Sequence, residues 1–154
     1  ENNMNRQARR EAKHRKPQLG KTLTLPKIIM RQYAFEGIDA ALNTLKSNHI
    51  DHIDGQPVVW DREETSFLVL SELLSGWIEY WKTIAKKTGR THNWVALDQL
   101  LAIIDTPRDL TLDLIADCEL SVNKMKDWYM QVDYDLLRNT SIDLGIQFRL
   151  EALQ

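Results

Sequence analysis

The sequence has one cysteine, four prolines and six glycines in 154 residues, and it has no long apolar run. The single cysteine, Cys118, cannot form an internal disulfide, so we expect the fold to depend on its apolar core. One unpaired thiol suits a reducing compartment, and no stretch approaches the ~18 apolar residues of a membrane span. No apolar signal segment follows the basic start. We therefore expect a protein of the host cell cytoplasm with no membrane partner.

The sequence also lacks the short motifs that accompany common catalytic and metal chemistry. It contains no G-x-S-x-G, P-loop, G-x-G-x-x-G, H-E-x-x-H or C-x-x-C pattern. Cys118 falls on the apolar side of a predicted helix, where a thiol usually behaves as a small inert hydrophobe. We therefore predict no catalytic residues, no cofactor and no bound metal, and we interpret the chain as a non-enzyme.

Charge is distributed unevenly along the chain. The first 32 residues hold nine Lys or Arg against two acidic residues, whereas the rest hold eleven against twenty. The net charge of −2 for the whole chain does not reveal this contrast. A segregated basic segment usually binds phosphate groups or an acidic protein surface.

We divide the chain into a basic N-terminal arm, residues 1–20, and a single helical domain, residues 21–154. Met4 is the expected native start, so residues 1–3 carry no functional argument. Drawn as a helix, residues 4–16 place most basic side chains on one side, although like charges at that spacing oppose helix formation. We expect the arm to fray until an acidic surface orders it. Its candidate residues for binding nucleic acid or an acidic partner are Arg6, Arg9, Arg10, Lys13, Arg15 and Lys16.

Apolar residues recur at intervals of three and four through most of the domain, which is the pattern of amphipathic helices. The spacing predicts five helices, near 26–47, 64–88, 94–106, 110–131 and 133 to almost the end. Short linkers make consecutive helices antiparallel neighbours. We therefore predict an all-α fold, a bundle of about five helices.

Several residues are predicted to define the helix ends. Pro26 suits the first position of the first helix. Gly89 is expected to end the second helix. The candidate caps at helix starts are Asp61, Thr65 or Ser66 for the second helix, Asp109 for the fourth, and Asp133 or Asp135 for the fifth.

Residues 49–60 interrupt the helical pattern. Asp54 and Gly55 stand between β-favouring residues and predict a hairpin, whereas Pro57 restricts the second run to an edge strand or an extended loop. We therefore expect a short hairpin or extended excursion here.

The same segment concentrates metal-ligand side chains, namely His49, Asp51, His52 and Asp54. A closed metal site needs fixed geometry and usually a ligand from a second element, which His14 or His92 would have to supply. We favour a polar turn, and a metal-dependent enzyme built on His49 and His52 is the least favoured alternative.

The five tryptophans fall into two groups. Four lie on apolar helix stripes and are expected to fill core volume rather than stack on nucleic-acid bases, namely Trp77, Trp81, Trp94 and Trp128. Trp60 lies outside the periodic helices, and we expect it to be exposed or to contact a partner.

Asp105, Asp109, Asp113 and Asp117 recur every four residues around the start of the fourth helix. The simpler interpretation is a solvated face whose first acids complement the helix dipole. The alternative is a carboxylate stripe that docks a basic partner, either the arm of this protein or a nucleic-acid-binding groove. Our candidate residues for binding a protein partner are Asp109, Asp113, Asp117 and Trp60.

The start M-N-R-Q-A-R-R-E-A at residues 4–12 resembles the M-(N/S)-R-x-A-R-R-x-A starts of small uncharacterised phage and prophage proteins. The D-G-Q-P-V run at residues 54–58 and the helix containing Gly76 and Trp77 are also similar to segments of that group. The resemblance implies a phage gene and an all-helical fold, and it transfers no functional residue. Small phage accessory proteins commonly bind host machinery, for example as anti-CRISPR or other anti-defence inhibitors.

These observations favour a non-catalytic interaction protein that binds and modulates a host protein or ribonucleoprotein complex, acting as a homodimer. The alternative is a nucleic-acid-binding protein whose basic arm neutralises phosphates.

Overall fold

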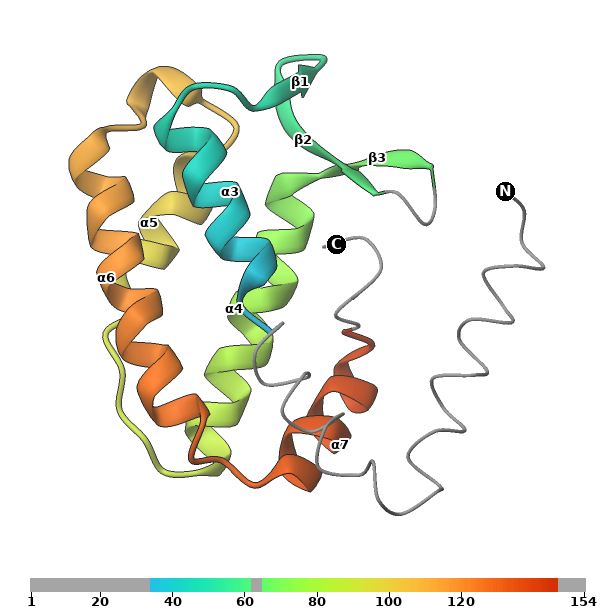
Figure 1. The fold of residues 1–154 in the computed structure, drawn as a ribbon, viewed down its shortest axis with the longest axis vertical. Helices are drawn as coiled ribbons and strands as arrows, with labels where there is room; N and C mark the ends of the chain where they lie inside the picture. Colours follow the sequence, from blue (N-terminus) through green and yellow to red (C-terminus); the bar gives the residue numbers. More distant parts are fainter. Residues whose placement is uncertain (1–33, 62–64, 147–154) are drawn as a thin grey trace.

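The computed structural model describes residues 34–61 and 65–146. Its elements are α3 (Glu36–Lys46), β1 (Asp51–Ile53), β2 (Gln56–Asp61), β3 (Ser66–Val69), α4 (Leu70–Lys87), α5 (Val95–Ile103), a 3-10 turn (Pro107–Asp109), α6 (Leu112–Tyr129) and α7 (Tyr134–Leu144). These five helices and one short sheet confirm the predicted helical bundle with an extended excursion (Figure 1). The basic arm and the predicted first turns at 26–33 lie outside the described residues.

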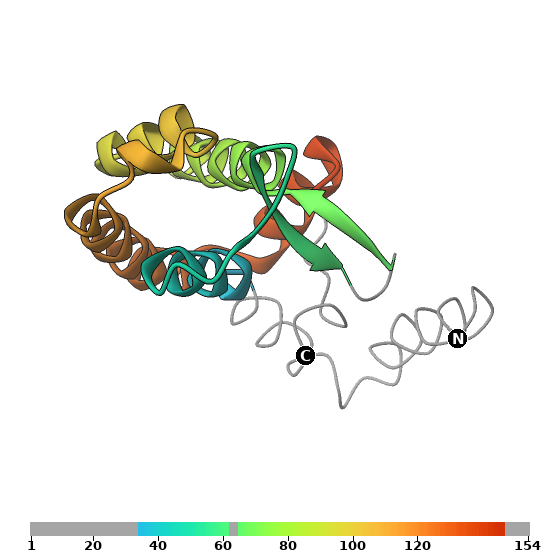
Figure 2. The ribbon, with the colours of Figure 1, turned by 90° about the horizontal axis from the view of Figure 1, so that it is seen from above.

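The helices pack on one another in the spatial order α3, α6, α5, α4 and α7, and β2 and β3 also pack on α4. Seen from above, α3 and α4 lie on opposite sides of the core, with α6 beside α3 and α5 beside α4 (Figure 2). The predicted apolar stripes supply this core. Among their buried members are Phe35, Ile38, Leu42, Leu74, Ile78, Trp81, Leu97, Ile115, Val122 and Leu137.

Aromatic side chains occupy the centre of the core. Trp81 is fully buried and stacks on Phe35, with ring centroids 5.2 Å apart. Phe35 also contacts Tyr129, whose ring meets it edge-on with ring centroids 4.9 Å apart. The Tyr129 hydroxyl lies 2.8 Å from that of Tyr80, and burial raises the pKa of Tyr80 to about 12. The Tyr80 hydroxyl therefore stays neutral at physiological pH.

The sheet differs from the sequence prediction at its third strand. Residues 66–69 form β3, whereas the periodicity predicted that a helix begins near residue 64. The helix begins at Leu70 instead, and its N-cap is Val69, which makes no side-chain cap. The prediction that Asp61, Thr65 or Ser66 caps this helix is therefore wrong. Residues 66–69 pair with β2 across a short hairpin, and β3 then continues directly into α4, so strand pairing rather than helical periodicity decides the structure of these residues.

Pro57 was expected to restrict β2 to an edge or a loop, yet β2 is the central strand of the sheet. The register explains how the proline is accommodated. Pro57 pairs with His52 of β1, whereas β3 pairs only with residues 58–61. Pro57 thus lies where β2 has a neighbour on one side only, so its missing N–H does not interrupt a second ladder.

The ends of the last two helices also depend on local hydrogen bonds. Thr111 caps α6, because its side chain accepts a hydrogen bond from the Leu114 N–H, whereas Asp109 lies in the preceding 3-10 turn. The predicted cap at Asp133 is confirmed. The predicted extension of this helix to almost the end of the chain is wrong, because Gly145 ends it with a left-handed backbone at φ +69°.

The cap assignment predicts a contrast between two neighbouring side chains. Thr111→Ala should lower the free energy of unfolding by about 1 kcal/mol, because the Leu114 N–H loses its acceptor. Asp109→Asn should change it by less than about 0.5 kcal/mol, as an exposed substitution outside the helix. Chemical denaturation of both variants measures the contrast, and a larger cost at Asp109 would contradict the assignment.

Candidate interaction surfaces

The outer face of the sheet carries exposed apolar side chains. Trp60 pairs directly with Phe67, and Ile53 pairs with Gln56, so the register places all four side chains on one face. Ile53, Trp60 and Phe67 are 45%, 51% and 43% exposed. The rings of Trp60 and Phe67 meet edge-on with centroids 5.0 Å apart. We call Ile53, Trp60 and Phe67 the aromatic face.

Both faces of β2 contribute buried side chains, because Val58 is buried although it lies on the same face as Trp60. Val59 packs against the core, and Pro57 and Asp61 are buried. The predicted exposure of Trp60 is confirmed, whereas Phe67, which the periodicity placed on a buried helical stripe, lies exposed in β3. The sheet thereby holds two aromatic rings away from the core on a strand pair anchored to α4.

The predicted carboxylate stripe is exposed along its whole length. Asp105 follows α5, Asp109 lies in the 3-10 turn, and Asp113 and Asp117 lie on α6. Asp105 accepts a hydrogen bond from the Gln56 side chain at 3.4 Å, which links the stripe to the hairpin. The structure therefore places all four carboxylates at the surface, in two neighbouring segments rather than in one compact cluster.

An apolar row that was not predicted from the sequence lies beside this stripe. Leu112, Ala116 and Leu120 are exposed on α6 at intervals of four residues, away from the buried stripe of the same helix. The repeat is visible in the sequence, but the buried stripe through Ile115 and Val122 accounts for the helix so well that the second row was not recognised. We call these three residues the outer row of α6.

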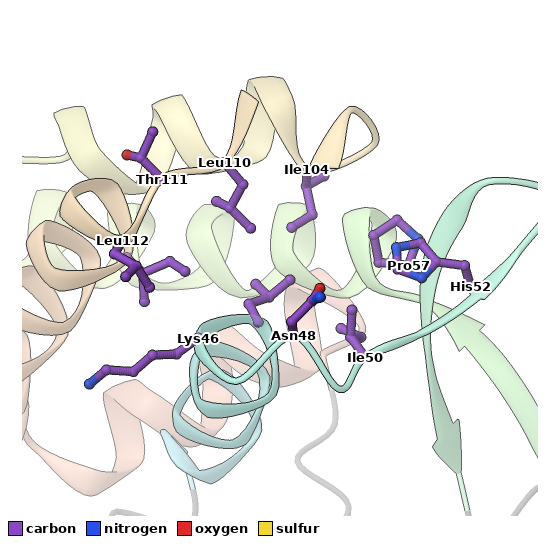
Figure 3. Close-up of a pocket in the computed structure, with 11 residues that line it drawn as sticks. Lys46, Asn48, Ile50, His52, Pro57, Ile104, Leu110, Thr111 and Leu112 are labelled. Atoms are coloured by element: carbon purple, nitrogen blue, oxygen red, sulfur yellow. The ribbon is translucent and has the colours of Figure 1, made fainter. Parts of the chain in front are cut away.

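A small cleft opens near the start of α6. It has a volume of about 210 Å³ and lies between the end of α3, the first hairpin, the end of α5 and the start of α6 (Figure 3). Its walls are mainly apolar, including Leu45, Ile50, Ile104 and Leu112, with Lys46, Asn48, His52 and Thr111 as polar members. This volume is below that of typical small-molecule sites and suits a single side chain.

The histidine- and aspartate-rich segment forms the first hairpin. Asp54 and Gly55 both have positive φ, at 53° and 82°, as a tight two-residue β-turn requires. Asp51 and His52 are consecutive in β1 and therefore point to opposite faces. No group of three or more His, Cys, Asp or Glu side chains is arranged to hold a metal ion within the described residues. The pairing of β1 with β2 confirms the predicted hairpin in this segment.

His92 and Ser121 form the one pair in the described residues that resembles a nucleophile with its base, with Nε2 2.9 Å from Oγ. The direction of the hydrogen bond argues against that role. The Trp128 indole N–H donates to His92 Nδ1 at 3.2 Å, and because an indole N–H can only donate, the ring proton must be on Nε2. His92 therefore donates to Ser121, whereas a base must accept the hydroxyl proton.

This arrangement also requires neutral His92. Burial lowers the pKa of His92 from its usual value, and the charge of Lys124 lowers it further. A protonated ring would present Nδ1–H to the Trp128 N–H and lose that hydrogen bond. The cluster of His92, Ser121 and Trp128 is thus a structural clasp that joins the segment after α4 to α6.

We expect this clasp to make the protein sensitive to mild acid. The unfolded chain binds a proton at His92 first as the pH falls, because the folded-state pKa lies below the unfolded value of about 6.5. Neutral His92 contributes fully to the free energy of unfolding above about pH 6.5. This contribution is lost as the pH falls through the folded-state pKa. His92→Gln keeps an acceptor and a donor but does not titrate. Its melting temperature should fall less than that of the wild type between about pH 7.5 and pH 5.5, and equal losses would contradict the clasp.

Cys118 is fully buried and donates to the Ala96 carbonyl at 3.4 Å. Burial raises the pKa of its thiol to about 12, with the charges of Asp117 and Glu119 acting in the same direction. A thiol with so little thiolate is a poor nucleophile. The structure thus agrees with the interpretation of Cys118 as a core residue.

The six basic arm residues that we selected lie outside the described residues. Of the helices that the structure describes, none combines the length and the apolar character that a bilayer span requires. Comparisons of the chain with protein-family models, with curated proteins and with solved structures find no match. The chemistry of the surfaces therefore carries the functional argument.

Proposed function

We propose that this chain is a non-catalytic interaction protein that binds and modulates a larger host complex. The aromatic face is the observation that supports this proposal most strongly. Exposed tryptophan and phenylalanine side chains in mutual contact are typical anchors of protein interfaces, because they bury a large apolar area at a small entropic cost. A helical bundle that holds them in a fixed position further favours binding.

The resemblance of the N-terminal motif to small phage proteins supports a phage origin. In that setting the partner is a protein or ribonucleoprotein complex of the host cytoplasm, and the outcome of binding is inhibition of a host defence system. The carboxylates at Asp109, Asp113 and Asp117 are the alternative contact surface, and they favour a partner with basic side chains.

The test is affinity capture of host proteins on the full chain, with and without nuclease treatment. A stoichiometric protein partner that survives nuclease, and that binds again when purified, is the expected result. Capture of nucleic acid alone, or loss of every partner after nuclease, would overturn the proposal.

Nucleic-acid binding by the basic arm is the second candidate function. Six Lys or Arg between residues 6 and 16 support it, because each can neutralise a backbone phosphate. Nuclease treatment in the capture experiment separates this candidate from the first, because only a nucleic-acid ligand is destroyed by it.

A further inference from the structure

The outer row of α6 is an apolar line that no described element covers. Leu112 and Leu120 are 66% and 56% exposed, and Ala116 lies between them one helical turn from each. α6 packs on α3 and α5 through its opposite side, which holds Ile115 and Val122. We take this aligned row as the candidate contact surface.

Acidic side chains flank this row on one side. Asp113 and Asp117 each follow a member of the row by one residue, and both are exposed. Neither has an ion-pair partner among the described residues, whereas Glu119 on the same helix lies 3.3 Å from Lys46. The occupant of this surface therefore needs a row of small apolar side chains with two positive charges on one flank, four residues apart.

The basic arm of this chain has the required pattern. Met4, Ala8 and Ala12 are spaced by four residues, and Arg9 and Lys13 each follow an alanine of that row by one residue. In a helix these spacings form an apolar row with a basic flank. The small alanines would let the arm approach the leucines of α6 closely.

We propose that residues 4–16 of this chain dock as a helix on the outer row of α6. In both helices the charged flank follows the row by one residue, so the two flanks face each other only when the helices are antiparallel. Arg9 then lies opposite Asp117, and Lys13 lies opposite Asp113.

The connection between the arm and the described domain permits this docking. Residues 17–33 separate the two, and at up to ~3.3 Å per residue they span the bundle easily. Exposed ion pairs contribute only about 0.2–1 kcal/mol each, so docking is reversible and sensitive to salt. While the arm is docked, Arg9 and Lys13 are not available to an external phosphate or carboxylate.

Disulfide cross-linking on the full chain tests the docking. Ala8→Cys is combined with Ala116→Cys in one protein and with Ala40→Cys in a control, and both are oxidised with copper phenanthroline. Ala40 is exposed on α3 and closer to the arm in sequence, so undirected motion of the arm favours the control. Native Cys118 stays unreactive because it is buried.

We expect cross-linking at position 116 to be about tenfold faster than at position 40. Asp113→Lys with Asp117→Lys should remove most of this advantage, and adding Arg9→Glu with Lys13→Glu should restore it. The expected product is a cross-linked monomer on a non-reducing gel, whereas a covalent dimer would place the arm on a second copy and overturn docking within one chain. Equal rates at positions 116 and 40, or no effect of charge reversal, would overturn it. These variants leave the aromatic face intact, so partner binding through that face is tested independently of the docking.

Discussion

Replacing Trp81 with alanine is expected to lower the free energy of unfolding by about 3–5 kcal/mol, the largest stability effect we predict for a single side chain. Trp81 is fully buried and stacks on Phe35 at the centre of the core. Its removal leaves a cavity between α3 and α4 and takes away the ring contact. Chemical denaturation monitored by circular dichroism measures the loss.

A second variant at the same position separates packing from polarity. The Trp81 indole N–H is buried and has no hydrogen-bond partner among the described residues, which is unfavourable in the folded state. Trp81→Phe keeps a ring against Phe35 and removes that N–H. We expect it to cost about half as much as the alanine variant or less, and equal costs would contradict this account of the site.

The double variant Trp60→Ala with Phe67→Ala is expected to weaken binding to the captured partner by at least about 30-fold. That value corresponds to the loss of about 2 kcal/mol that defines an interface hot spot. Both rings are exposed, and their cross-strand contact stabilises the sheet by no more than about 1 kcal/mol. The circular dichroism spectrum should therefore stay close to that of the wild type.

A matched control is Ile142→Ala on α7, which removes an apolar side chain that is 60% exposed but lies on a different element. Its partner affinity should not change. If the double variant stays folded and binds with wild-type affinity, the aromatic face is not the interface. The carboxylates of α6 would then be the next residues to test.

The sequence predicted the helical elements well because the rule behind them is local. A helix that is buried on one side must repeat its apolar residues every three or four positions, and the series from Leu74 through Ile78 to Trp81 does so. Caps were less predictable, since several polar residues near each start could serve. Local geometry selected Thr111 rather than Asp109 and Asp133 rather than Asp135.

The third strand was not predictable because its apolar spacing fits a helix as well as a strand. Phe67, Leu70 and Leu74 fit helical spacing as a continuous series, so a local criterion extends the helix over residues 66–69. Pairing with β2 makes these residues a strand, because the register places Val58 and Trp60 opposite Val69 and Phe67. Whether a short apolar run forms a helix or a strand therefore depends on the segments that pair with it.

The candidate interaction residues divide in the same way. Trp60 could be selected from the sequence because it lies outside every periodic stripe, and the exposed carboxylates could be selected because of their regular spacing. The contact of Trp60 with Phe67 was not predicted, because it depends on the pairing of β2 with β3. The cleft was not predicted, because it joins segments that are far apart in the chain.

The sequence by itself determined the helical class, the positions of most core side chains and the separation of a basic arm from an acidic domain. These features follow from composition and periodicity, which do not depend on distant contacts. Only the tertiary structure decided which apolar side chains stay at the surface. Whether Phe67, Leu112 and Leu120 are buried depends on which elements pack beside them, and local sequence does not contain that information.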